Sequence, residues 1–194
     1  MIIKTTEFIK SSSNCKECPQ TNIPEFSFIG RSNVGKSSLI NMITKKKIAK
    51  VSRNPGKTLL INHFLVNSNW FLVDLPGYGY ANISKKEKRK IENIITDYFK
   101  NRDNLLLTFI LIDIRHEPQI IDLDFMSWLS NNNINFKIIF TKEDKLKARD
   151  KEEKIKKYLN IFFEKIKISP KNTISSSKLK SGRKEIINFI YSEL

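Results

Sequence analysis

Long apolar segments are missing from this 194-residue chain, in which hydrophobic residues make up 40%. The longest apolar run, residues 105–112, falls far short of the roughly 20 residues that span a bilayer. The opening MIIKTTEFIK leads into polar residues and lacks the apolar segment that export requires. Internal repeats and long linkers are missing too. We therefore expect a cytoplasmic protein with no membrane contact, a single well-cored domain that buries roughly 70% of its unfolded surface.

Cysteine and histidine are nearly absent, with two residues of each. Cys15 and Cys18 form a lone C-x-x-C, but SNCKECPQ offers neither four zinc ligands nor the strand-to-helix turn of a redox pair. We predict two reduced thiols on the protein surface. His63 alternates with apolar neighbours and has no Ser, Cys or metal cluster to work with, so we predict a structural histidine.

Acidic residues are in short supply: 35 Lys and Arg stand against 20 Asp and Glu, giving a net charge of +15 and a pI near 9.8. This balance favours a polyanionic partner such as RNA, or an acidic surface. Basic runs lie at residues 45–50, 85–90 and 142–157. The last two are partly helical, so solvated helix faces are an equally good interpretation, and both stay open.

Strand-like and helix-like segments alternate along the chain. We predict strands at residues 24–29, 59–66, 70–74, 105–113 and 136–140, with a short one in NTIS, and helices at residues 36–44, 120–130 and 183–194. The strands flanking the turn NSN should pair as a hairpin. This pattern predicts an α/β fold: a mainly parallel central sheet with one antiparallel hairpin strand and helices on both faces. We expect residues 1–22 to be an N-terminal extension and residues 23–194 to be one domain.

Two further helices show one apolar face each. Ser84 and Glu87 form a capping box, and the apolar positions that follow repeat with helical spacing: Ile91, Ile94, Ile95, Tyr98 and Phe99. A later helix carries the predicted buried face Ile155, Tyr158, Leu159, Phe162 and Phe163. Met126 and Trp128, in the helix at residues 120–130, are predicted core residues.

The stretch GRSNVGKSS lies between a predicted strand and a predicted helix and fits G-x-x-x-x-G-K-[ST]. In such a loop, backbone N–H groups surround phosphate oxygens, while the lysine and a hydroxyl reach the outer phosphates and Mg²⁺. The following helix adds the partial positive charge of its N-terminus. We predict a phosphate-binding loop made of Gly30, Arg31, Ser32, Asn33, Val34, Gly35, Lys36, Ser37 and Ser38.

Polar segments also follow three later strands, at the edge of the sheet where parallel α/β folds bind ligands. Asp74-Leu75-Pro76-Gly77 offers an aspartate for Mg²⁺ through water and a glycine N–H for a γ-phosphate. In Thr141-Lys142-Glu143-Asp144, the last carboxylate could accept both N–H groups of guanine. Ser175-Ser176-Ser177 could meet the guanine O6. Each segment alone also describes an ordinary turn or a solvated loop, but their order along the chain predicts a guanine-nucleotide site.

The chain resembles GTPases of the TrmE/Era type, and more closely the EngB (YihA/YsxC) family of ribosome-biogenesis GTP-binding proteins. The strings that carry this resemblance are GRSNVGKSSLIN, PGKTLLINHFLV, LVDLPGYGYA, LIDIRHEPQIIDLDFMSWL and IIFTKEDK. PGYGYA and RHEPQ are not shared by GTPases in general. The resemblance implies a Ras-like P-loop GTPase domain that binds GTP or GDP with Mg²⁺.

The resemblance also implies residue roles. Lys36 would contact the β/γ oxygens, and the metal would be held by Ser37, Thr58 and Asp74. The first switch would comprise Gly56, Lys57, Thr58, Leu59 and Leu60, and the second Asp74, Leu75, Pro76 and Gly77. Thr141, Lys142, Glu143 and Asp144 would read the base, supported by Ile174, Ser175, Ser176 and Ser177. Thr141 replaces the commoner asparagine; EngB proteins have threonine here, so guanine specificity should survive, although a shorter side chain is expected to brace the neighbouring loop less well.

Catalysis would rest on Lys36, Thr58, Gly77 and Asn33. Tyr78 stands where Ras-type enzymes have the glutamine that orients water, so we expect slow intrinsic hydrolysis. Asn33 matches an asparagine that binds K⁺ in some relatives, although an ordinary loop hydrogen bond would equally explain it. Arg115 and His116, after a strand end, could contact a partner or brace a helix.

The resemblance implies a monomer that acts on the large ribosomal subunit precursor or its ribosomal RNA, with defects in cell division and septation on its loss. A nucleotide-gated RNA or ribosome binding module with negligible hydrolysis is the alternative. An ATP-dependent P-loop kinase is disfavoured by TKED and by the lack of an arginine-rich lid.

Overall fold

The computed structural model describes residues 2–49, 60–79 and 83–194. In this part of the chain one sheet runs in the order β1 (Thr6–Ser12), β3 (Ile61–Val66), β4 (Trp70–Asp74), β2 (Glu25–Gly30), β5 (Leu105–Asp113), β6 (Phe136–Thr141) and β7 (Asn172–Ile174). β3 pairs antiparallel with both β1 and β4, whereas the remaining described pairs are parallel. The predicted hairpin and its antiparallel strand are confirmed.

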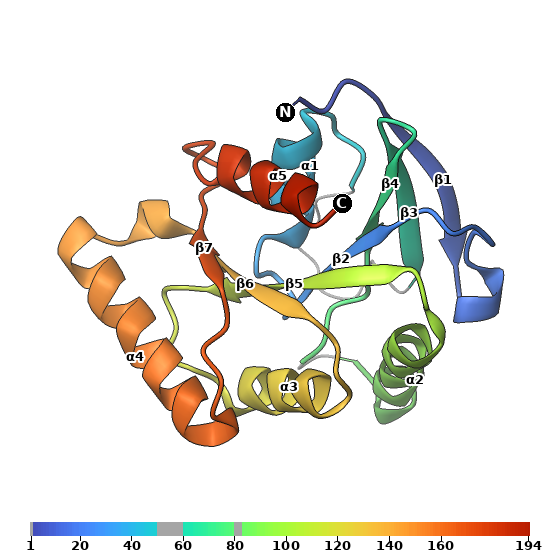
Figure 1. The fold of residues 1–194 in the computed structure, drawn as a ribbon. Coiled ribbons are helices and arrows are strands. Elements are labelled where there is room, and N and C mark those ends of the chain that lie inside the picture. Colours follow the sequence, from blue (N-terminus) through green and yellow to red (C-terminus); the bar gives the residue numbers. More distant parts are fainter. Residues whose placement is uncertain (1, 50–59, 80–82) are drawn as a thin grey trace.

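Helices cover both faces of the sheet, as predicted. α1 (Lys36–Thr44) and α5 (Arg183–Ser192) lie on one face, and α2 (Lys85–Asn101), α3 (Ile120–Asn131) and α4 (Ala148–Ile166) lie on the other (Figure 1). Each layer has its own buried cluster: Phe28 of β2 and Ile40 of α1 belong to one, and Ile110 of β5 and Met126 of α3 belong to the other. Among the described helices, none is both long and apolar enough to cross a membrane.

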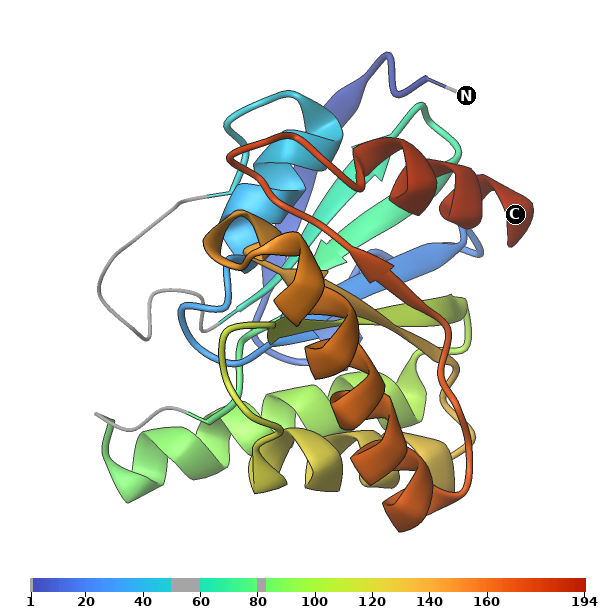
Figure 2. The same cartoon turned by 90° about the vertical axis from the view of Figure 1, so that its left-hand side faces the viewer.

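The apolar run of β5 is explained by burial on both faces of the sheet. Leu107, Phe109 and Leu111 point into the cluster beneath α1 and α5, while the intervening Ile110 and Ile112 point toward the other three helices. A strand covered on one side would have alternated with polar residues. The central strands run parallel to one another, so their carboxyl ends lie at one edge of the sheet (Figure 2).

The sequence signals for α2 are confirmed. The Ser84 hydroxyl accepts the Glu87 N–H at 3.2 Å, and the Glu87 carboxylate accepts the Ser84 N–H at 3.0 Å. The predicted apolar face is the buried one, comprising Ile91, Ile94, Ile95, Tyr98 and Phe99. The second predicted face is only partly right, because Tyr158 and Phe162 of α4 are buried whereas Phe163 is 50% exposed. Met126 is fully buried and Trp128 packs half-buried against the same cluster, in line with the predicted core.

The N-terminal segment contributes a strand that the sequence did not indicate. β1 lies at the edge of the sheet beside β3, and a bulge between Phe8 and Lys10 shifts its register. Phe8 and Ile9 are exposed. Only Thr6 and Ser12, the two end residues of β1, are buried, so the segment shows neither a strand-like alternation nor an apolar run.

The two cysteines are buried, which corrects the predicted surface position. Cys15 is 6% exposed and Cys18 is 2% exposed, and both are free thiols. A short 3-10 turn at Cys15–Glu17 brings them under the end of α2, where the Cys15 N–H donates to the Asp97 carboxylate at 2.7 Å. The cysteines are buried because this turn packs against α2, which is 82 residues away in the chain at the Asp97 contact, and the polar local sequence gives no sign of it.

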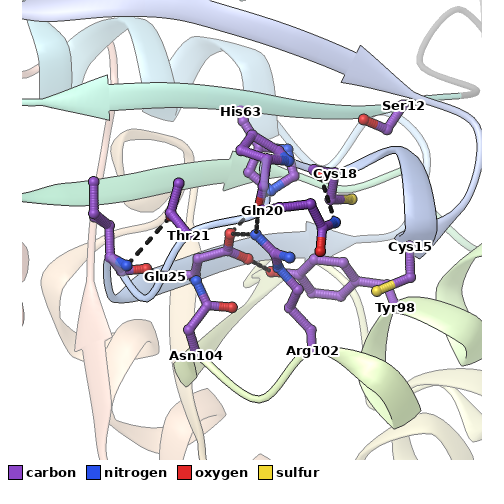
Figure 3. A network of polar contacts seen from close by, with 12 residues as sticks. Ser12, Cys15, Cys18, Gln20, Thr21, Glu25, His63, Tyr98, Arg102 and Asn104 are labelled. Carbon is purple, nitrogen blue, oxygen red and sulfur yellow. Dashed lines mark hydrogen bonds and ion pairs between the residues drawn. The ribbon is translucent and has the colours of Figure 1, made fainter.

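His63 is a structural histidine, as predicted. It is fully buried, and its Nε2 lies 3.1 Å from Oε1 of Glu25 at the start of β2. The same carboxylate accepts the Tyr98 hydroxyl at 2.7 Å and Arg102 Nη2 at 2.5 Å (Figure 3). Burial by itself would raise the pKa of Glu25, but His63, Arg102 and Tyr98 together lower it to about 2.

Candidate nucleotide-binding site

The predicted phosphate loop connects the end of β2 to the first turn of α1. Gly30 passes so close to β5 that a Cβ would lie 2.7 Å from the Leu111 carbonyl oxygen, which explains the need for glycine. Gly35 has φ +104°, a conformation that side chains disfavour, and caps α1. The loop therefore presents the N-terminus of α1, which favours bound anions.

Lys36, the first residue of α1, is buried and pairs with the Asp74 carboxylate at the end of β4. Lys36 begins the helix that follows β2, and Asp74 ends β4, so the predicted phosphate loop and the segment Asp74-Leu75-Pro76-Gly77 lie side by side. Leu75 continues the contact, because its N–H donates to the Phe28 carbonyl at 3.1 Å. The ion pair therefore joins Lys36, which is predicted to contact phosphate oxygens, to Asp74, which is predicted to hold the metal.

Two residues of the predicted base-reading segment reach the phosphate loop. The Thr141 hydroxyl is buried and donates to the Val34 carbonyl at 2.8 Å. Lys142 Nζ donates to the Asn33 carbonyl at 2.7 Å and pairs with Asp113 at 2.8 Å. Thr141 therefore braces the loop directly despite its short side chain.

The fourth residue of this segment contacts the predicted base support. Asp144 Oδ1 accepts the Ser176 hydroxyl at 2.7 Å, and this bond lowers the pKa of Asp144. Ser175 and Ser176 are buried, while Ser177 and Ile174 are half-buried beside them. A charged carboxylate fixed next to a serine loop can accept a pair of N–H donors on a planar base.

Sequence reasoning missed Ser181 and Gly182, which hold the base-support loop. Ser181 bonds to the Glu143 carboxylate, and its backbone carbonyl accepts the Ser175 hydroxyl at 3.0 Å. Gly182 has φ +76°, and a Cβ there would lie 2.4 Å from the Ile174 carbonyl. Gly182, which follows the polar segment at residues 175–181, was the sequence signal that could have indicated this tight turn.

Arg115 braces its own loop in this structure. Its guanidinium lies across both oxygens of Asp113, with Nη2 to Oδ2 at 2.7 Å, and Lys142 contacts the same carboxylate. Burial would raise the pKa of Asp113, but hydrogen bonds from Arg115 and Lys142 lower it to about 2. His116 lies further off, at 3.7 Å.

A second missed pair is Tyr78 and Asp122. Tyr78 comes directly after Gly77, and its hydroxyl donates to Oδ1 of Asp122 in the first turn of α3 at 2.9 Å. The Tyr78 ring also packs on Phe125, with centroids 4.5 Å apart. The two residues are 44 positions apart in the chain, so no local sequence pattern predicts this contact.

Most of the predicted first switch lies outside the described residues, namely Gly56, Lys57, Thr58 and Leu59. Leu60, the last residue of that group, is 40% exposed. Ser37 and Ser38 are half-buried in the first turn of α1. Within the described part of the chain, no cluster of three His, Cys, Asp or Glu side chains forms a metal site by itself.

The basic run after the second switch is solvent-exposed. All residues at positions 85–90, the first turns of α2, are exposed, and five of them are Lys or Arg. Lys45, Lys46 and Lys47, after α1, are exposed as well.

Comparisons with known proteins agree with this geometry. The family model described as "50S ribosome-binding GTPase" matches residues 25–142. The probable GTP-binding protein EngB of Christiangramia forsetii is 53% identical over 191 residues, covering 98% of this chain and 96% of the relative. The corresponding protein of Porphyromonas gingivalis is 47% identical over 191 residues, covering 98% and 95%.

Solved structures show the same fold. A crystal structure of a probable GTP-binding protein engB has a TM-score of 0.69 at 25% identity, covering 87% of this chain and 97% of that chain. Aquifex aeolicus Era, bound to GDP and AlF4⁻, has a TM-score of 0.69 at 18% identity, covering 88% and 56%. Because its curated relatives match it over nearly their full length and the family model covers residues 25–142, the chain belongs to the EngB family of GTP-binding proteins.

Proposed function

We propose that this protein binds GTP and GDP at the strand edge described above and acts as a slowly hydrolysing switch in assembly of the large ribosomal subunit. The observation that carries the proposal is the cross-brace between Thr141 and the Val34 carbonyl, because it joins the base-reading and phosphate-binding segments into one site. Asp144, held by Ser176, is the proposed acceptor of the guanine N–H donors.

The chain's own residues supply the binding chemistry. Backbone N–H groups at the start of α1 face the phosphates, and Lys36 exchanges its Asp74 partner for β/γ oxygens. This exchange frees an Asp74 oxygen. The ion pair therefore links phosphate arrival to the release of a metal-binding carboxylate.

The donor set fits Mg²⁺, which prefers oxygen ligands and keeps several waters. Ser37 would supply its hydroxyl and Asp74 its carboxylate through water, with Thr58 as the proposed third donor. When bound, the ion neutralises charge on the β and γ phosphates. Lys36, Thr58 and Gly77 are the proposed catalytic residues, and Asn33 the proposed K⁺ ligand.

Slow hydrolysis is supported by Tyr78. Its side chain is 7% exposed and its hydroxyl is bonded to Asp122, so it points into the protein interior. The position directly after Gly77 holds Tyr78 and not the glutamine that orients water in Ras-type enzymes. A partner or K⁺ would complete the site.

The proposed partner is the large-subunit precursor or its ribosomal RNA. The matching family is described as a 50S ribosome-binding GTPase, and the exposed basic turns at positions 85–90 come after the proposed second switch in the sequence. Such a surface binds phosphate backbones in a salt-dependent way. We further propose a cytoplasmic monomer with one GTPase domain at residues 23–194, to which the preceding extension adds β1, and a role in cell division and septation.

A nucleotide-gated binding module with negligible hydrolysis is the second candidate, and the inward position of Tyr78 favours it. In that case exchange alone would switch the loops.

Co-sedimentation with large ribosomal subunits tests the proposal, in GDP and in the non-hydrolysable analogue GDPNP, across a salt series. We expect binding with GDPNP that weakens as salt rises. Binding that ignores the nucleotide would contradict the switch. Turnover stimulated by immature subunits would support the enzyme over the binding module.

A further inference from the structure

The base-support loop, residues 175–181 between β7 and α5, has little apolar surface to hold it in place. Its sequence SSSKLKS contains a single apolar residue, Leu179, which is 61% exposed. A backbone bridge closes the loop, because the Ser181 N–H donates to the Ser176 carbonyl at 3.1 Å. Since apolar burial contributes little here, the position of the loop depends on the polar contacts of its serines.

Ser181 connects this loop to the base-reading segment. Its hydroxyl donates to Oε1 of Glu143 and accepts the Ser176 N–H at 3.0 Å. The Ser176 hydroxyl in turn donates to Oδ1 of Asp144 at 2.7 Å. Two serines thus join the adjacent carboxylates of Glu143 and Asp144 in one ring of hydrogen bonds, which the backbone between these two residues closes.

Both oxygens of the Glu143 carboxylate are engaged by other residues of the protein. Oε1 accepts the Ser181 hydroxyl, and Oε2 accepts Nζ of Lys151 in α4 at 3.0 Å. The Glu143 side chain is 14% exposed. Burial would raise the pKa of Glu143, but hydrogen bonds from Ser181 and Lys151 lower it, so the group is charged at neutral pH. The carboxylate is thereby fixed between α4 and the base-support loop.

We infer that Glu143 is a positioning residue for guanine recognition: through Ser181 and Ser176 it holds Asp144 in place to accept the N–H donors of the base, and it makes no base contact itself. The inference rests on the proposed function and deepens it, because it separates Asp144, which would contact guanine, from Glu143, which acts through the serines. A side chain that is fixed before the ligand arrives loses less conformational freedom on binding, and affinity rises accordingly.

Two other roles for Glu143 make different predictions for GDP and inosine diphosphate (IDP). Hypoxanthine lacks the exocyclic amine of guanine, so Asp144 can accept one N–H from IDP and two from GDP. If Glu143 only ties α4 to the protein through Lys151, its loss lowers stability and lowers both affinities by the same factor. If Glu143 contacts the base itself, removal of the Ser181 hydroxyl leaves the ratio of the two affinities unchanged.

Ser181→Ala removes the hydroxyl that links Glu143 to the base-support loop. Affinities for GDP and IDP are measured with Mg²⁺ on the full chain, by competition against fluorescent GDP. We expect the ratio of GDP to IDP affinity to fall about threefold to tenfold, the range that one net hydrogen bond supplies. An unchanged or higher ratio overturns the inference. Failure of the wild-type protein to bind GDP would instead overturn the proposed function.

Substitutions of Glu143 complete the test. Glu143→Ala should lower the ratio as much as Ser181→Ala, and the double variant should lower it little further, because both substitutions remove the same bond. Glu143→Gln keeps an oxygen that can accept the Ser181 hydroxyl, so it should lower the ratio less than Glu143→Ala. Additive effects of the two alanine substitutions, or an equal loss in Glu143→Gln and Glu143→Ala, would overturn the inference.

Thr173→Val is the matched control. It also removes a hydroxyl that donates to a glutamate carboxylate, here Glu185 of α5 at 2.6 Å, and Thr173 lies in β7, the strand that leads into the base-support loop. We expect lower thermal stability and an unchanged ratio of GDP to IDP affinity. An equal fall of the ratio in Thr173→Val and Ser181→Ala would show a general loss of stability and overturn the inference.

Discussion

The Thr141 hydroxyl lies 2.8 Å from the Val34 carbonyl oxygen and joins two segments 107 residues apart in the chain. Thr141→Val keeps the shape of the side chain and removes this bond. We expect affinity for GDP to fall about threefold to tenfold, because the loop loses one net hydrogen bond. Equilibrium titration with fluorescent GDP measures the change.

Thr108→Val provides the control for this substitution. Thr108 is fully buried, and its hydroxyl lies 2.9 Å from that of Ser27 within the sheet. The Thr108→Val substitution should reduce the stability of the protein and leave its affinity for GDP unchanged. Equal losses of affinity in both variants would contradict a direct brace by Thr141.

Asp144→Asn should change base preference from guanine toward xanthine. The carboxylate is the proposed acceptor of two guanine N–H groups, and an amide presents one donor in its place. Two charge-assisted bonds predict a loss of GDP affinity of about a hundredfold or more, with a gain for XDP. Competition titrations with both nucleotides measure it. Asp150→Asn, at an exposed position in the first turn of α4, should change neither affinity.

Asn33 has φ +64° and an exposed side chain beside the proposed phosphate site. If it holds K⁺, GTP turnover should be several-fold faster in KCl than in NaCl at matched ionic strength, because the cation stabilises charge in the transition state. Asn33→Ala should abolish the difference. Equal rates of the wild-type protein in both salts would leave the loop hydrogen bond as the explanation.

Glu25 should make the protein sensitive to acid. The folded-state pKa is about 2, below the ordinary 4.5, so its contribution to stability is complete above pH 4.5 and is lost as pH falls toward 2. The shift corresponds to about 3 kcal/mol. Urea unfolding of wild type and Glu25→Gln at pH 7 and pH 3 tests this.

The variant should be destabilised by about 3 kcal/mol at pH 7, because Arg102 is left buried without its partner. Its stability should also fall less than that of wild type between pH 7 and pH 3. Parallel pH curves for the two proteins would refute the assignment. Glu7→Gln, at an exposed position in β1, should behave as wild type.

Much of the fold was visible in the sequence because burial shapes local patterns. β5 is covered on both faces and shows a continuous apolar run, and α2 carries both its cap and its apolar face in sequence. β1 escaped detection because its exposed Phe8 and Ile9 and its bulge break the alternation. Phe163 was misplaced because helical spacing does not say how wide a helix face the sheet covers.

The candidate site also contains residues that the sequence predicts and residues that it does not. Motif residues such as Lys36 and Asp144 follow strand ends, so topology brought them together as predicted. The partners Asp122 and Ser181 lie on other elements and satisfy buried polar groups, which is a property of the folded structure and leaves no periodic signal. Cys15 and Cys18 were misplaced for the same reason.

The two buried cysteines allow local unfolding of the N-terminal segment to be measured by their reaction with alkylating reagents. Burial raises the pKa of Cys15, and it raises the pKa of Cys18 to about 12, so little thiolate is present at neutral pH. Alkylating reagents then react only when the turn at Cys15–Glu17 separates from α2. The alkylation rate would time local unfolding at the far end of the sheet without any introduced label.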